Sequence, residues 1–256
     1  MTQEYSFVIG DNTYTVRDES ELALIFEVLS GGEDISWLIH WNVIMELDDS
    51  LLFLIKTYKG LLRCLKSLDE KNSFLLLIKI GDNLSKVIQN SEELWVILAR
   101  IPEEENKVRI LKQIRAVWLK KIVSWPKDLS NIFEWIYDDS QRKFFEIIGH
   151  EYTRSLFTYP KEIYNVLHYL SNENKDILIE IIGRKNIIAH IKTWKDLLFI
   201  LKWVPTTQAW KILTSFSRQE IKNMFLSNAD FTYFIKKLSE RKTKVFLQHL
   251  HLPYEQ

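Results

Sequence analysis

A phrase of about 34 residues recurs along this chain, and no other feature constrains the fold as strongly. The clear copies begin at residues 91, 126, 160, 194 and 228, at spacings of 34 or 35 residues. Each copy opens with apolar residues at relative positions i, i+3, i+4 and i+7, which mark one face of an α-helix. In the first clear copy these are Leu94, Ile97, Leu98 and Ile101. An earlier copy starts at Tyr58, and residues 22–29 resemble a degenerate first copy.

The residues around these apolar positions indicate where the helices of each copy begin and end. Pro126 and Pro160 stand at helix entrances, where a missing N–H costs nothing. Acidic residues, which the positive end of a helix dipole favours, occupy the third position of five copies. They are Glu93, Asp128, Glu162, Asp196 and Asp230. A polar link, a second helix and a shorter third helical segment follow, and Gly81, Gly149 and Gly183 stand where the second helix should end.

The sequence therefore predicts an all-α fold, an α-solenoid of ~34-residue helical repeats, each with two helices plus a short connector helix. The repeats should start near residues 58, 91, 126, 160, 194 and 228 and fill residues 58–256. One such repeat cannot bury its apolar faces alone, so neighbouring repeats must stack on one another.

The first 57 residues differ from the rest of the chain. Apolar residues alternate in Tyr5 to Ile9 and in Tyr14 to Val16 around Gly10, Asp11 and Asn12, which predicts a short β-hairpin. We expect this hairpin to cap the first helical layer. We interpret residues 35–58, which are dense in apolar and aromatic side chains, as a helix buried under the cap. Residues 1–57 carry a net charge of −9 and residues 58–256 carry +9, so these two ranges form the expected division of the chain.

Two long segments show the repeated pattern most fully, SEELWVILARIPEEENKVRILKQI and PKEIYNVLHYLSNENKDILIEIIGRKNIIAHIKTWKDL. Residues 58–250, which contain these segments, resemble the helical-repeat proteins found among type IV-secreted effectors of intracellular bacterial pathogens of the Legionella and Coxiella kind. The resemblance implies delivery by a type IV secretion system into a host cell. It also implies that the protein binds or regulates a host protein there, and it brings no catalytic residues with it.

No motif in the sequence indicates catalysis, a metal site or a cofactor. We therefore expect no catalytic residues, no metal site and no cofactor. The histidines form no HExxH motif, and the phosphate-binding and nucleophile motifs GxxxxGK[ST], GxGxxG and GxSxG do not occur. The single cysteine, Cys64, occupies an apolar position of the repeat and is expected to be a buried, unreactive thiol. An enzyme whose site is assembled from residues distant in sequence stays open as an alternative.

Two features of the repeats suggest binding. The tenth residue of three successive copies is aromatic, namely Trp135, Tyr169 and Trp203, and these side chains could form an exposed ridge that contacts a protein. Alternatively, the three rings fill gaps between repeats.

The second feature is a basic cluster in the last repeat that could meet nucleic acid or anionic lipid, or could simply be a solvated end. Its members are Lys236, Lys237, Arg241, Lys242 and Lys244.

Taken together, these features favour a non-enzymatic scaffold or adaptor that binds a protein partner, a host protein if the effector resemblance holds. Nucleic-acid or anionic-membrane binding through the basic C-terminal repeats is the alternative. No apolar run reaches the ~20 residues of a membrane-spanning helix, and the first residues lack the pattern of a signal peptide. We therefore expect a cytoplasmic protein, secreted into the host cytosol if it is an effector.

Overall fold

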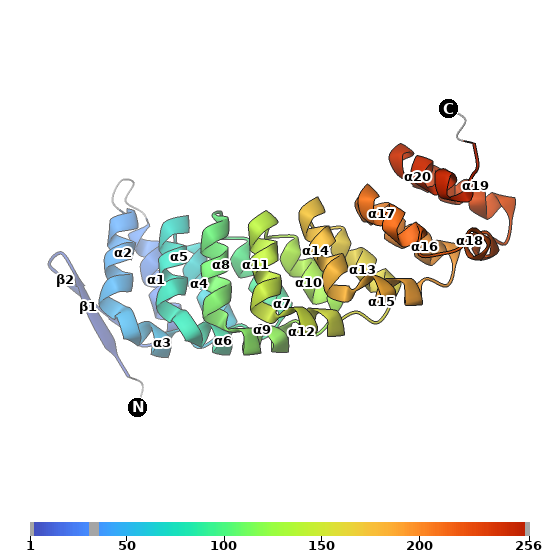
Figure 1. Cartoon of the computed structure of the whole chain (residues 1–256). Coiled ribbons are helices and arrows are strands. Elements are labelled where there is room, and N and C mark those ends of the chain that lie inside the picture. The colour runs from blue at the N-terminus through green and yellow to red at the C-terminus, as the bar shows by residue number, and fades with distance from the viewer. Residues whose placement is uncertain (1–2, 31–35, 254–256) are drawn as a thin grey trace. The chain divides into compact units, whose positions relative to one another are not determined.

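The computed structural model describes residues 3–30 and 36–253, and within these ranges the chain is mostly helical with a small hairpin near its N-terminus (Figure 1). Two compact parts can be distinguished, an N-terminal half, Met1–Val123, and a C-terminal half, Ser124–Gln256. The all-α class and the hairpin are thereby confirmed. In the part of the chain that is described, no helix is long and apolar enough to cross a membrane.

The hairpin consists of β1 (Tyr5–Ile9) and β2 (Asn12–Val16), which pair in antiparallel fashion with Phe7 opposite Tyr14. Its turn contains Gly10 at a φ of 59°, a conformation that glycine adopts without steric cost. Phe7 and Val16 are buried, and the two strands contact the first two helices, α1 (Glu19–Leu29) and α2 (Ser36–Leu47). The hairpin thus covers the start of the helical region.

The helices of the N-terminal half follow the order of two helices and a short third one, three times in succession. The first set is α1, α2 and α3 (Leu51–Leu54), with a 3₁₀ turn at Asp48–Ser50 before α3. The second is α4 (Tyr58–Lys66), α5 (Glu70–Ile80) and α6 (Leu84–Val87), and the third is α7 (Ser91–Leu98), α8 (Glu104–Ile114) and α9 (Ala116–Ile122). The degenerate first copy is therefore a full three-helix repeat, and the division expected at residues 57 and 58 lies inside this half.

The C-terminal half continues the same order of helices. Its first two sets are α10 (Pro126–Phe133), α11 (Asp138–Ile148) and α12 (His150–Ser155), then α13 (Pro160–Leu167), α14 (Asn172–Ile182) and α15 (Arg184–His190). Then come α16 (Trp194–Trp203), α17 (Thr206–Leu213) and α18 (Arg218–Met224), and finally α19 (Asn228–Lys237) and α20 (Glu240–Leu250). In this half, the first helices of successive repeats contact one another, α10 with α13, α13 with α16, and α16 with α19.

The interpretation of residues 35–58 as a helix buried under the cap is wrong for one face of α2. His40, Val43, Ile44 and Leu47 are buried as expected, but an adjoining face of the helix exposes large apolar side chains. These exposed side chains are Trp37, Leu38, Trp41 and Met45. Because both faces of α2 are apolar, the density of apolar residues does not reveal which face meets the core.

The acidic third residue of the repeat acts as a helix cap. The Asp128 carboxylate accepts the backbone N–H groups of Ser124 and Trp125 at 2.9 and 2.8 Å. Glu162 accepts those of Thr158 and Tyr159, both at 2.8 Å. The acids therefore satisfy backbone donors that the start of a helix leaves unpaired, in addition to meeting the positive end of its dipole.

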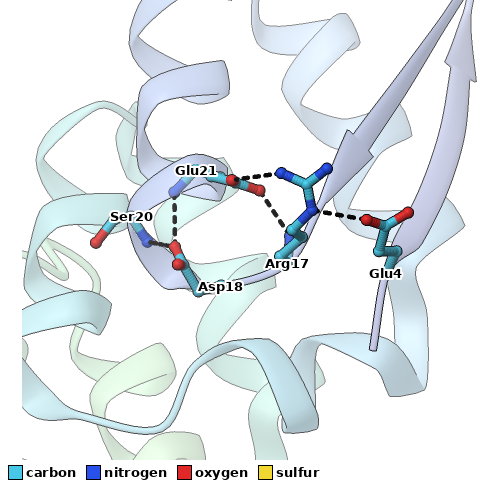
Figure 2. A network of polar contacts seen from close by, with 5 residues as sticks. All are labelled: Glu4, Arg17, Asp18, Ser20 and Glu21. Atoms are coloured by element: carbon cyan, nitrogen blue, oxygen red, sulfur yellow. Dashed lines mark hydrogen bonds and ion pairs between the residues drawn. The ribbon is translucent and has the colours of Figure 1, made fainter. Parts of the chain in front are cut away.

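The same device ties the hairpin to α1. Asp18, the N-cap, accepts the N–H groups of Ser20 and Glu21 at 2.8 and 3.0 Å, and the third residue, Glu21, accepts the N–H of Arg17 at 2.8 Å (Figure 2). The Arg17 guanidinium in turn pairs with Glu4 at 2.7 Å, just before β1. The pair is exposed on both sides, so it contributes little to stability, and the caps fix the entrance to α1.

Helix α4 departs from the acid rule, because its third residue is Gly60. Glu19 of α1 reaches across and accepts the N–H groups of Lys56 and Thr57 at 2.8 and 3.1 Å, and the Thr57 hydroxyl at 2.5 Å. A Cβ atom at Gly60 would overlap the carboxyl end of Glu19. The neighbouring repeat therefore supplies the acid that α4 lacks, and Gly60 leaves the room for it.

This exchange of capping acids predicts a coupling between positions 19 and 60. Glu19→Ala should lower the free energy of unfolding by about 0.5–2 kcal/mol, the usual effect of a lost cap. Gly60→Glu alone should lower it by about 1–3 kcal/mol, because the new side chain overlaps Glu19. In the double variant the glutamate introduced at position 60 can cap its own helix, so the loss should be smaller than the sum of the two by roughly 1 kcal/mol. Urea unfolding followed by circular dichroism measures all three, and additive losses would contradict the exchange.

The junction between the second and third helices places one residue at positive φ in successive repeats. Gly81, Gly149 and Gly183 occupy it at φ values of 54°, 86° and 85°, which confirms that these glycines end the second helix. Arg115 holds the equivalent position after α8 with a φ of 65° and a ψ of 143°. This region of backbone conformation is strained for a residue with a side chain.

Arg115→Gly should therefore stabilise the protein by about 1 kcal/mol, because relief of the strain outweighs the glycine's greater unfolded-state entropy. The exposed ion pair between Arg115 and Asp82 is lost, but such pairs contribute about 0–1 kcal/mol. Gly183→Ala at the matching junction should destabilise by about 1 kcal/mol or more. Thermal melting compares the two variants with the parent, and a lower melting temperature for Arg115→Gly would refute the assignment of strain.

Candidate functional site

Cys64 and the repeated acidic residues, two kinds of group that can take part in chemistry, occupy structural positions. Cys64 is fully buried, as predicted, and burial raises the pKa of its thiol to about 12, which disfavours the reactive thiolate. Within residues 3–30 and 36–253, no cluster of His, Cys, Asp and Glu could hold a metal ion. The repeated acids cap their own helices and do not gather.

The three aromatic residues predicted to form a ridge stand at the ends of α10, α13 and α16. Tyr169 is 36% exposed, whereas Trp135 and Trp203 are half-buried. The His168 ring links two of them, with centroids 4.9 Å from Tyr169 and 4.4 Å from Trp203. Tyr169 and Trp203 therefore both contact the His168 ring. Only a modest part of the predicted ridge is exposed and available to a partner. Its role in binding stays a prediction.

The basic cluster of the last repeat is partly engaged within the chain. Lys242 Nζ donates to the carbonyl of Lys202 at 2.7 Å, and burial together with nearby Lys175 lowers its pKa to about 8. Lys244 pairs with Glu240 at 2.8 Å, and Lys237 lies over the ring of Tyr233. Lys236 and Arg241 are exposed. The cluster therefore offers an anion fewer free charges than its five residues suggest.

The most distinctive surface is a groove in the N-terminal half that the sequence analysis missed. The second helices α2, α5 and α8 lie side by side, with α5 in the middle (Figure 1). A groove of about 630 Å³ runs over α5, and we call it the α5 groove. Its floor is Phe74, Leu75 and Ile78 of α5. One wall is Trp37 and Trp41 of α2, and the other is Arg109, Lys112 and Gln113 of α8, with Lys71 and Asn72 also lining it.

Side-chain amides hold both walls of the α5 groove against α5. Asn72, which is 2% exposed, donates its Nδ2 to the carbonyl of Trp37 at 2.9 Å and to Asp69 at 2.6 Å. On the other side, Gln113 Nε2 donates to the carbonyl of Ile78 at 3.2 Å. The bonds to the carbonyls of Trp37 and Ile78 join second helices of successive repeats, so the shape of the groove is set by the packing of these helices and is present before any partner arrives.

The α5 groove is positively charged. Lys71, Arg109 and Lys112 are exposed, and the Arg109 guanidinium lies 5.8 Å from the centre of the Phe74 ring. The residues that line the groove include no Asp or Glu. None of these three bases forms an ion pair with an acid in the described parts of the chain. An aromatic wall thus faces a basic wall across an apolar floor.

Comparison of the chain with models of protein families, with curated proteins and with solved structures finds no match. Function must therefore be argued from the chemistry of the surface. A periodicity in α2 could have indicated the groove, because Trp37, Trp41 and Met45 recur about one helical turn apart and form a second apolar stripe beside the buried His40 and Ile44. The basic wall carries no such signal, since Arg109 and Lys112 resemble any solvated helix face.

Proposed function

We propose that this protein is a non-enzymatic scaffold or adaptor that binds a protein partner through the α5 groove. The observation that carries the proposal is the exposed pair Trp37 and Trp41, at 55% and 42%, beside the apolar floor of α5. Soluble proteins rarely leave large apolar side chains gathered at the surface unless something covers them. Trp and Arg, which line opposite walls here, are the residues most enriched in the energetically dominant parts of protein interfaces.

The composition of the groove argues against catalysis there. Among the described side chains, its lining residues include no Asp, Glu, His or Cys, and its two lysines, Lys71 and Lys112, are exposed and not desolvated as an activated lysine would be. Its floor is a row of apolar side chains on one helix and has no deep polar centre. Such a surface suits the burial of a partner's apolar side chains.

We further propose that the repeats build an α-solenoid. In support, α1 contacts α4 in the N-terminal half, and α10, α13, α16 and α19 contact in succession in the C-terminal half. The apolar residues at the four repeated positions are buried in the copies that begin at residues 91, 126, 160 and 194, whereas Phe231 and Ile235 of the last copy are half-buried. In solenoids each repeat contacts its neighbours, and the stacked helices present extended surfaces for partners.

The resemblance to type IV-secreted effectors extends the proposal to a host protein as the partner and to the host cytosol as the place of action. This extension rests only on the repeated sequence segments within residues 58–250. Nucleic-acid or anionic-lipid binding through the last repeat is the less favoured alternative, because Lys237, Lys242 and Lys244 have partners within the chain.

The proposal predicts that Trp37→Ala/Trp41→Ala loses partners that the parent protein captures. Truncating central aromatic residues of an interface commonly costs about 2 kcal/mol or more, which is roughly thirtyfold in affinity. Immobilised parent and variant proteins are exposed to the same host-cell and bacterial lysates, and bound proteins are quantified by mass spectrometry. The expected result is the selective loss of at least one enriched protein from the double variant.

The matched control is Trp125→Ala, which removes a tryptophan that is 69% exposed outside the groove. It should retain the captured proteins, and both variants should keep the circular dichroism spectrum of the parent. An unchanged set of partners for Trp37→Ala/Trp41→Ala, or an equal loss for Trp125→Ala, would contradict binding through the α5 groove.

A further inference from the structure

We infer that the α5 groove binds an acidic amphipathic helix of the partner protein, lying along α5 with its apolar side chains on the floor and its carboxylates toward α8. This inference deepens the proposed function and rests on it. It commits to the chemistry of the partner, which the proposal itself leaves open.

The shape of the groove fits a helix. Its lining residues on α5 extend from Lys71 to Ile78, which at 1.5 Å per residue corresponds to about 10 Å, or two helical turns. The floor is a strip on one helix flanked by two neighbouring helices, a surface onto which a further helix can pack through side chains at i, i+3 or i+4, and i+7. The two indoles of α2 are one turn apart and can enclose one apolar side chain of such a helix.

Two of the three bases of the groove are on the α8 wall, and this placement sets the charge pattern expected of the partner. The third base, Lys71, is on α5 in line with the floor residues. Arg109 and Lys112 stand one turn apart on α8, whereas the opposite wall is aromatic and uncharged. A helix on the floor would therefore place one flank against bases and the other against indoles. Carboxylates on the flank of the partner helix that faces α8 can form charge-assisted contacts with Arg109 and Lys112, which have no acidic partner in the described chain. Basic side chains on that flank would be repelled.

A single-stranded nucleic acid also combines negative charge with stacking surfaces, but the groove fits it less well. Two of the three floor residues, Leu75 and Ile78, are aliphatic and offer no flat ring on which a base can stack. The basic side chains form a short wall, whereas nucleic-acid grooves follow the phosphate backbone with a longer positive strip. The floor is better matched to leucine, isoleucine or phenylalanine side chains.

Binding of designed peptides to the 256-residue chain tests the inference. The probes are a fluorescent 16-residue amphipathic helix with Leu and Phe on one face and Glu on the other, a twin with Lys in place of every Glu, a scrambled acidic peptide and a 12-residue oligothymidylate. Fluorescence anisotropy gives each dissociation constant at low and at physiological salt. The acidic helix should bind at least about tenfold more tightly than the Lys twin and the scrambled peptide, with an advantage that salt reduces.

Two variants locate the binding in the groove. Arg109→Glu/Lys112→Glu should reverse the preference in favour of the Lys twin. Its matched control, Lys59→Glu/Lys66→Glu on α4, changes the net charge equally outside the groove and should retain the preference for the acidic helix. Trp37→Ala/Trp41→Ala should weaken the acidic helix by about tenfold or more.

The outcomes separate this inference from the proposed function. Equal binding of the acidic helix and the Lys twin, with binding still lost in Trp37→Ala/Trp41→Ala, overturns the inference that the partner is acidic. The proposed function, a groove that binds a protein through apolar contacts, would then still hold. Binding that is insensitive to the two tryptophans overturns the inference, and the lysate capture then decides the proposed function separately. Displacement of the acidic helix by oligothymidylate at a lower concentration than unlabelled acidic helix overturns it in favour of a nucleic acid.

Discussion

The stacking of apolar faces between successive repeats is the interaction on which the rest of this structure depends. The helices are short, as α7 (Ser91–Leu98) shows, and isolated helices below about 12–15 residues are marginal in water. Leu94, Ile97 and Leu98 are fully buried, and each such side chain contributes about 1.5–3 kcal/mol when removed from water. Each helix is therefore stable because neighbouring helices cover its apolar face, and the α5 groove exists because three second helices are held side by side.

Capping and buried amides specify how the stacked helices are placed. The acidic third residue fixes the entrance of the first helix, and where α4 lacks it, Glu19 of the preceding repeat performs the same task. Gln141 and Asn174 join α11 to α14 through a 3.0 Å bond between their side chains, and Asn72 links α5 to α2 in a comparable way. Such buried polar groups must be satisfied to be tolerated, so they favour one arrangement of neighbouring repeats over others. At the α5 groove, the bonds from Asn72 to α2 and from Gln113 to α5 fix the positions of the two walls.

Local rules allowed much of the fold to be predicted, and surface features were harder to predict. The helix period, the acidic caps and the glycines at 81, 149 and 183 act within a few residues, so the sequence alone reveals them. Glu19 capping α4 could not be foreseen, because it depends on a contact between residues 38 positions apart. The exposed face of α2 was misjudged since both of its faces are apolar, and the basic wall of the groove comes from residues that no motif distinguishes. The predicted Trp135, Tyr169 and Trp203 share a position in the repeat, but repeat position does not determine exposure.

The central claim that we propose is that equivalent repeats stack within each half of the chain, and removing one whole repeat from the C-terminal half tests it most directly. Deletion of residues 160–193 joins Tyr159 to Trp194, so that α16 would take the place of α13 beside α10. The claim predicts that this variant keeps its helical circular dichroism per residue and unfolds cooperatively, at a lower temperature than the parent. Deletion of residues 160–176, half a period, should abolish cooperative unfolding because it removes the alternation of first and second helices. Loss of cooperative unfolding in the whole-repeat deletion as well would contradict the claim.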